Sequence, residues 1–198
     1  MSLNKIKHHD PIYNILVRIS FILFVLFTGW LLWDHFINRP PEIRHYLSGN
    51  NAFKDQNYSI SLDHYLKAYN YNNEDVYVIE GIARSYMQLK DYQKSKDYFN
   101  LAIKIDPNFA PSYANLGVLY DREKDYVNAI KFYEKALSLD QELSIGMHWI
   151  DRLLYDVRET PSTIGSRLDY LKLQMDLPED KRLLSVKEID QQQINYEK

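Results

Sequence analysis

The feature that most constrains the fold is a period of 34 residues in the middle of the chain. Three segments of equal length, residues 42–75, 76–109 and 110–143, align without an insertion. They share an aromatic position and a small position, occupied by Tyr65, Phe99 and Tyr133, and by Ala68, Ala102 and Ala136. A period of this length indicates helical units that bury their apolar faces against their neighbours.

Each unit contains two amphipathic helical patterns separated by a short break. In the third unit, Leu116, Leu119 and Tyr120 lie on one face of a first helix, because their spacing is i, i+3 and i+4. A polar residue before each second helix can accept a hydrogen bond from an unpaired helix N–H. These expected N-caps are Asn57, Asp91 and Asp125. The small residues expected where helices approach closely are Gly117, Ala129 and Ala136.

These positions resemble the tetratricopeptide repeat (TPR). The third unit matches best, through Tyr113, Leu116, Gly117, Tyr120, Ala129, Tyr133 and Ala136. It departs from the pattern at Gln141, where the second unit keeps Pro107. The first unit is the weakest, with His45, Ser48 and Ala52 at three signature positions, although Gly49 is retained. The resemblance covers about half of the chain, residues 42–143, and implies an all-α solenoid of three helical hairpins.

The resemblance also implies a groove lined by the first helices of the three units, which takes a peptide or helix of a partner protein. The groove residues carried over by position are Tyr46, Asn50, Phe53, Lys54, Tyr77, Glu80, Arg84, Met87, Ala114, Val118 and Arg122. Some TPR cochaperones grip a C-terminal carboxylate of heat-shock chaperones with Lys and Asn at fixed groove positions. Here the basic positions hold Tyr46, Pro111 and Asn115, and only Asn50 fits. We therefore do not expect a carboxylate clamp or a cytosolic chaperone partner.

A long apolar segment precedes the repeats. Residues 15–37 number 23, about 34 Å of helix at ~1.5 Å per residue, which is long enough for a bilayer core of ~30 Å. Arg18 can extend its guanidinium to one interface, and Trp30 and Trp33 suit the other. The prediction is an uncleaved transmembrane helix. A cleaved signal peptide and a buried core helix are the alternatives, but no small-residue cleavage site follows and Pro40 and Pro41 break the chain.

Basic residues set the expected orientation. Lys5, Lys7 and Arg18 precede or open the span, and Arg39 and Arg44 follow it, which favours a cytoplasmic N-terminus by one charge. The predicted location is a single-pass membrane protein, in a bacterial inner membrane with the repeats in the periplasm.

The remaining segments are predicted to close the array. Residues 1–14 form an N-terminal tail, and residues 144–156 form a capping helix whose apolar stripe is Ile145, Trp149, Ile150, Leu153 and Leu154. Residues 157–198 form a C-terminal helical extension and tail. A short amphipathic helix is expected there from the spacing of Ile164, Leu168, Leu171 and Met175, and Pro178 is expected at the first position of a further helix. The tail is either a loose end or a segment that folds onto the array or a partner.

The sequence offers little reactive chemistry. The chain has no cysteine, which excludes thiolate metal sites and cysteine nucleophiles, and its net charge of −3 gives no footprint for nucleic acid. The six histidines show no metal-ligating spacing, so no catalytic, cofactor or metal site is expected. The prediction is a membrane-anchored protein-interaction module, acting as scaffold, assembly factor or chaperone-like helper of a membrane or envelope complex. A self-assembling homo-oligomer is the alternative, and an enzyme a remote one.

Overall fold

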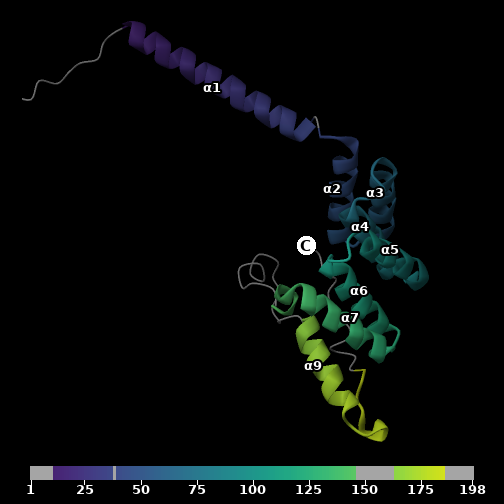
Figure 1. The fold of residues 1–198 in the computed structure, drawn as a ribbon. Coiled ribbons are helices and arrows are strands. Elements are labelled where there is room, and N and C mark those ends of the chain that lie inside the picture. The colour runs from purple at the N-terminus through teal and green to yellow at the C-terminus, as the bar shows by residue number, and fades with distance from the viewer. Residues whose placement is uncertain (1–10, 38, 146–162, 186–198) are drawn as a thin grey trace, which may run out of the picture.

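The computed structural model describes residues 11–37, 39–145 and 163–185, and its regular elements in these ranges are helices. Figure 1 shows one long helix followed by a stack of shorter ones. The elements are α1 (Pro11–Ile37), α2 (Pro41–Lys54), α3 (Tyr58–Tyr71), α4 (Val76–Gln88), α5 (Tyr92–Ile105), α6 (Ala110–Arg122), α7 (Tyr126–Leu139), the 3₁₀ helix η1 (Gln141–Ser144), α9 (Ile164–Met175) and the 3₁₀ helix η2 (Glu179–Lys181).

The three predicted units appear as the hairpins α2–α3, α4–α5 and α6–α7 (Figure 1). Small residues lie where the helices of a pair meet. A Cβ atom added to Gly117 would stand 2.4 Å from the ring of Tyr133, and one added to Gly49 would stand 2.7 Å from Tyr65. Tyr65 also packs against Gly81 of the next unit, where an added Cβ would lie 2.6 Å away. The small residues are therefore required by ring packing both within and between units.

The backbone turns inside the hairpins repeat with the same period. Gln56, Lys90 and Lys124 each adopt a positive φ, between 60° and 67°. The next residue is the N-cap of the second helix, and Asp91 and Asp125 cap that helix by accepting from the N–H three residues on, at 3.4 and 3.2 Å. The expected cap at Asn57 is wrong in one respect: the backbone has similar torsions, but the side chain makes no capping hydrogen bond.

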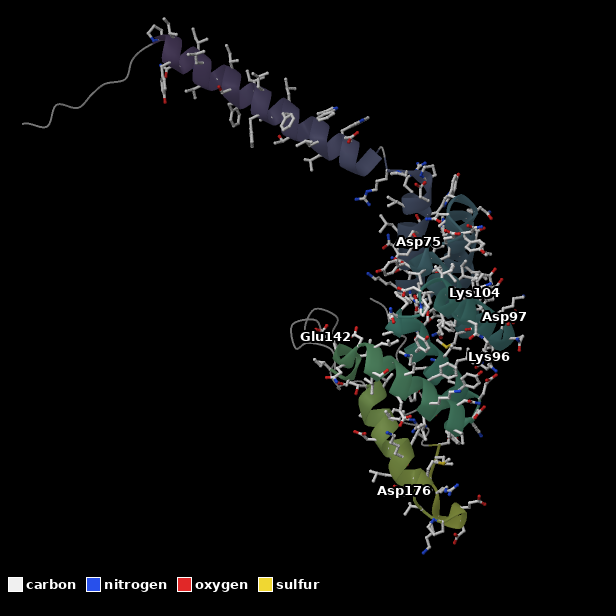
Figure 2. All side chains as sticks on the ribbon, viewed as in Figure 1. Asp75, Lys96, Asp97, Lys104, Glu142 and Asp176 are labelled. Carbon is white, nitrogen blue, oxygen red and sulfur yellow. The ribbon has the colours of Figure 1, made fainter. Side chains whose placement is uncertain are left out.

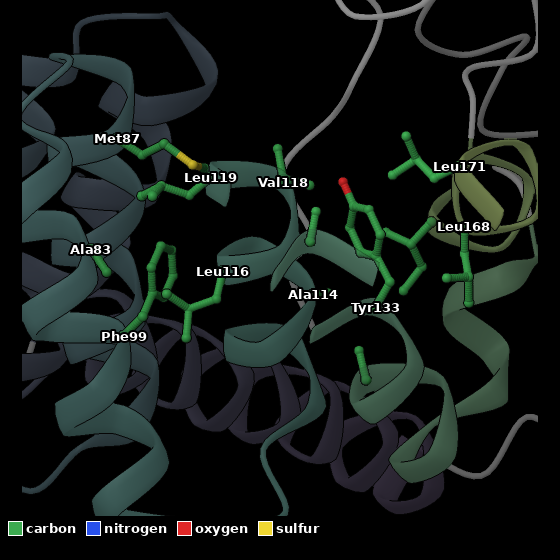
Figure 3. Close-up of a cluster of buried hydrophobic side chains, with 13 residues drawn as sticks. Ala83, Met87, Phe99, Ala114, Leu116, Val118, Leu119, Tyr133, Leu168 and Leu171 are labelled. Carbon is green, nitrogen blue, oxygen red and sulfur yellow. The ribbon is translucent and has the colours of Figure 1, made fainter. Parts of the chain in front are cut away.

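The core runs through the stack and reaches beyond the repeats. Its larger cluster begins at Phe99 and Met87, passes through Leu116 and Leu119, and includes Leu171 of α9 (Figure 3). α9 packs against α7 and η1. The amphipathic spacing that begins at Ile164 thus predicts this helix correctly, and its apolar face extends the core of the third unit.

In the C-terminal region, one expected helix lies mostly outside the described residues and a second is replaced by a 3₁₀ turn. The predicted capping helix 144–156 lies outside the described residues apart from its first two positions, where Ser144 ends η1. Pro178 does not open an α-helix: it is the residue before η2, a single 3₁₀ turn, and its C=O accepts from Lys181 at 2.9 Å. The Arg182 side chain donates to the carbonyl groups of Leu177 and Met175, at 2.8 and 3.1 Å.

α1 extends away from the stack (Figure 1), and its side chains point outward around the whole helix (Figure 2). The segment Pro11–Asp34 is apolar: its most apolar window of 18 residues has a mean hydropathy of 2.3, and none of that window is buried. The core helix of a soluble protein would be mostly buried, unlike this window. The helix is long and apolar enough to cross a membrane, and a signal sequence would share these two properties.

Candidate partner-binding face

The first helices of the three units present equivalent rows of side chains. On each helix three residues spaced i, i+4 and i+7 share one face, because this spacing returns close to the same angle. We call the nine residues the first-helix face: Tyr46, Asn50 and Phe53 of α2, Glu80, Arg84 and Met87 of α4, and Ala114, Val118 and Asp121 of α6. α4 contacts both α2 and α6, so the rows are neighbours in space.

An ion pair occupies the middle of the face. Arg84 Nε donates to Glu80 Oε2 at 2.8 Å, and the two side chains are only 3% and 4% exposed. Asn115 of α6 donates to the other carboxylate oxygen of Glu80 at 2.8 Å. The guanidinium of Arg84 lies 4.7 Å from the ring centroid of Phe53 on α2, in cation–π geometry. The pair therefore joins all three first helices through charge-assisted and aromatic contacts.

A second ion pair lies at the α6 end of the face. Arg167 of α9 donates from Nε and Nη2 to the two carboxylate oxygens of Asp121, both at 2.8 Å. Both side chains are 2% exposed. Tyr133 donates to the same carboxylate at 3.1 Å. This bidentate geometry fixes α9 against α6 as well as satisfying both charges.

Tyrosines of the second helices hold polar side chains of the face in two units but not in the middle one. Tyr65 donates to Asn50 at 2.5 Å, and Tyr133, at the same repeat position, donates to Asp121. The middle unit has Phe99 there, which has no hydroxyl. Its face is held instead by the pair between Glu80 and Arg84.

The predicted groove residues differ widely in exposure. Tyr77 and Lys54 are exposed, and Tyr77 packs edge-on against Phe109 with ring centroids 5.3 Å apart. Partly buried are Tyr46, Asn50, Phe53 and Arg122, whereas Glu80, Arg84, Met87, Ala114 and Val118 are buried. Met87, Ala114 and Val118 also belong to the main core cluster (Figure 3).

Three polar residues of the network were not predicted as groove residues from the sequence. Asp121 continues the row of Ala114 and Val118 at i+7, a signal that was available, but Arg122 was chosen in its place. Asn115 was considered only as a clamp position. Arg167 had no signal, because it lies outside the repeats and its partner is 46 residues away.

The described residues show no group of three or more side chains that could hold a metal ion. His45 of α2 and His64 of α3 approach each other, with their Nδ1 atoms 3.2 Å apart. A hydrogen bond in which one Nδ1–H donates to the other Nδ1 accounts for this contact without a ligand.

The three predicted interface residues of α1 are all exposed. Arg18 stands in its first third, while Trp30 and Trp33 are 59% and 61% exposed in its last third. The hydroxyl of Thr28 donates to the C=O of Phe24 at 2.8 Å, which satisfies that polar group inside its own helix.

Comparison with known proteins agrees with the repeat period. The tetratricopeptide repeat family matches residues 79–109 and 110–143. The chain is similar to "Hsp70-Hsp90 organizing protein 2" of Arabidopsis thaliana, 31% identical over 102 residues, which is 50% of this chain and 18% of that protein. It is 24% identical over 147 residues to "RNA polymerase II-associated protein 3" of Xenopus tropicalis, 74% of this chain and 22% of that protein. The chain thus spans about a fifth of these relatives.

Among solved structures, the chain resembles the "First TPR of Spaghetti (RPAP3) bound to HSP90 peptide SRMEEVD". The TM-score is 0.54 at 18% identity, over 69% of this chain and 94% of that one. This likeness concerns the fold. Together with the period, the hairpins and the family matches, it shows that the chain carries tetratricopeptide repeats and is built as an all-α TPR solenoid.

Proposed function

We propose that the protein is a membrane-anchored interaction module whose first-helix face binds a peptide or helix of a partner in a membrane complex, as scaffold, assembly factor or chaperone-like helper. The observation that carries the proposal is a set of polar groups fixed on three consecutive units. Asn50, Glu80 and Asp121 are each held by a second side chain, at 2.5 to 3.1 Å. Groups fixed in advance can bind a partner at a lower cost in conformational entropy.

The charges of the face favour a particular kind of peptide. A neighbour in fold was solved with an HSP90 peptide ending in acidic and apolar residues. Here the cations Arg84 and Arg167 are already paired with carboxylates of the same chain. An acidic peptide end would have to compete with these carboxylates, so we propose that the partner segment carries apolar anchors and uncharged polar groups, with Tyr77 as an exposed aromatic contact.

We further propose that α1 anchors the module in a membrane with a cytoplasmic N-terminus. Its outward apolar surface, the arginine near one end and the tryptophans near the other support a spanning helix. The placement in a bacterial inner membrane with periplasmic repeats stays a prediction, because the curated relatives reported above come from a plant and a frog. The mass of the mature chain tests the anchor: loss of the N-terminal residues would contradict it and indicate a signal sequence.

Site-specific crosslinking tests the binding face. A photo-crosslinking amino acid at Tyr77, on the first-helix side, should capture a partner in the native membrane. The matched control is the same group at Tyr71 of α3, which is 60% exposed but belongs to a second helix. Capture from Tyr71 and not from Tyr77 would contradict the proposed face. Sizing of the full chain in detergent tests the predicted alternative, a homo-oligomer.

A further inference from the structure

The described part of the chain ends beside the first-helix face. After η2 the chain turns back along α9, where the Leu183 N–H donates to the Gln174 side chain at 2.8 Å. One residue later, the C=O of Leu184 accepts from Arg167 Nη2 at 3.0 Å. This guanidinium is the one that pairs with Asp121. Ser185 therefore stands one residue beyond a contact with the last row of the face.

The middle of the face is closed to water. All residues from Val78 to Ser85 are buried, and eight successive residues at ~3.6 per turn go around the whole helix more than twice. Among the described elements, α4 packs mainly against α3 and α5, with smaller contacts to α2 and α6. The side of α4 that these contacts leave open carries the first-helix face. Glu80 and Arg84 on that side are nevertheless only 3% and 2% exposed.

We propose that residues 186–198 bind the first-helix face of their own chain and block it against a partner. This inference rests on the proposed function, because the segment is assigned the partner's place. Its thirteen residues can extend over ~43 Å, whereas three neighbouring helix axes at ~8–10 Å span about 20 Å. The segment is therefore long enough to cross all three rows from Ser185.

The composition of the segment fits the face. It offers three large apolar side chains, Ile189, Ile194 and Tyr196, and the amides of Gln191–Gln193 at its centre. Its five charged residues stand toward its two ends: Lys187, Glu188, Asp190, Glu197 and Lys198. The face has its arginines and carboxylates already paired, so uncharged polar groups and apolar anchors suit it better than a charged cluster. A tethered segment also acts at an effective concentration of about mM, so a foreign partner must compete with it.

The absence of cysteine from the chain allows a direct test, because one introduced cysteine is the only thiol. Val118→Cys places this thiol on the face, at a residue that is 1% exposed. Maleimide labelling is compared between the full chain in detergent and a chain that ends at Ser185. We expect labelling at least tenfold faster in the shorter chain. A synthetic peptide of residues 186–198, added to the shorter chain, should slow it again.

Val127→Cys is the matched control, because Val127 of α7 is 65% exposed and should be labelled rapidly in both chains. Equally slow labelling of Val118→Cys in both chains, with unchanged helical content, would overturn the proposal. If the shorter chain does not fold, the full chain with Ile189→Asp and Ile194→Asp replaces it, again with tenfold faster labelling expected and an unchanged rate as the refuting result. A different result would contradict the proposed function: no crosslink to a partner from Tyr77 in the shorter chain, in which residues 186–198 no longer cover the face.

Discussion

The two buried ion pairs of the first-helix face are alike in burial and distance but differ in what they connect. Glu80 and Arg84 lie one turn apart on α4, whereas Asp121 and Arg167 belong to α6 and α9 and are 46 residues apart. In each pair both side chains are at most 4% exposed and the closest distance is 2.8 Å. The geometry of the pair alone therefore does not reveal its role.

The difference lies in when each pair can form. A pair at i, i+4 can form as soon as its own helix forms, so its partners meet without the rest of the array. The pair of Asp121 and Arg167 exists only when α9 is docked. Since breaking a buried pair leaves an uncompensated charge, the first pair should affect the middle of the array, and the second should affect the attachment of α9.

The largest expected effect is the loss of the long-range pair. Asp121→Asn leaves the Arg167 guanidinium buried without a carboxylate, which costs about 3–5 kcal/mol. Because about 1.4 kcal/mol is a factor of ten, amide exchange in α9 should accelerate at least 100-fold. Hydrogen exchange of the full-length protein in detergent, followed by mass spectrometry, measures this.

Glu80→Gln is the matched variant, because it removes the carboxylate of the local pair. We expect Glu80→Gln to lower the free energy of unfolding by about as much as Asp121→Asn does. Amide exchange should, however, accelerate in α4 and its neighbouring helices, while the amides of α9 stay more protected than these. If Glu80→Gln and Asp121→Asn loosen the same segments, the two pairs are not distinct in role.

A smaller effect tests whether the local pair also joins units. Asn115→Ala removes the donor from α6 to Glu80, a hydrogen bond to a charged group worth about 2 kcal/mol. We expect the exchange of α4 and α6 to accelerate together, since this bond links them. Faster exchange in α6 alone would show that Glu80 is satisfied within its own helix.

The sequence predicted the array well and the polar network poorly, for a physical reason. The period, the hairpins and the packing glycines follow from local spacing, which appears in a single chain without any partner. Glu80 and Arg84 were predicted as groove residues from their position in the repeat, and their pairing is local because they lie at i and i+4 on α4. Arg167, the partner of Asp121, could not be predicted, because its position depends on how α9 packs against the hairpin α6–α7. No sequence pattern relates two residues that are 46 positions apart and lie on different helices.

A third prediction uses the tyrosines that support the face. Tyr133→Phe removes the hydroxyl that donates to Asp121, with an expected cost of about 1.5 kcal/mol, because the acceptor is charged. Tyr65→Phe removes the equivalent bond to the neutral Asn50 and should cost about 1 kcal/mol or less. Phe99 shows that a phenylalanine fits this repeat position, so packing is preserved. Denaturant unfolding of the two variants measures the difference, and an equal loss would show that the charge of Asp121 is irrelevant to the bond.

The smallest prediction checks that the units carrying the two pairs are otherwise equivalent. Lys90 and Lys124 hold φ values of 64° and 67° in the turns that follow the last row of the face, and their N–H groups donate to Met87 and Asp121 at 3.2 and 2.9 Å. A left-handed conformation costs a residue with a Cβ about 1 kcal/mol or more, whereas glycine adopts it freely but loses more entropy on folding. Lys90→Gly and Lys124→Gly should therefore each stabilise the protein by about 0.5 kcal/mol, and the corresponding alanine variants should not. Unequal gains, measured by denaturant unfolding, would mean that the turns themselves differ, and the contrast between the two ion pairs would then have to be corrected for the stability of their units.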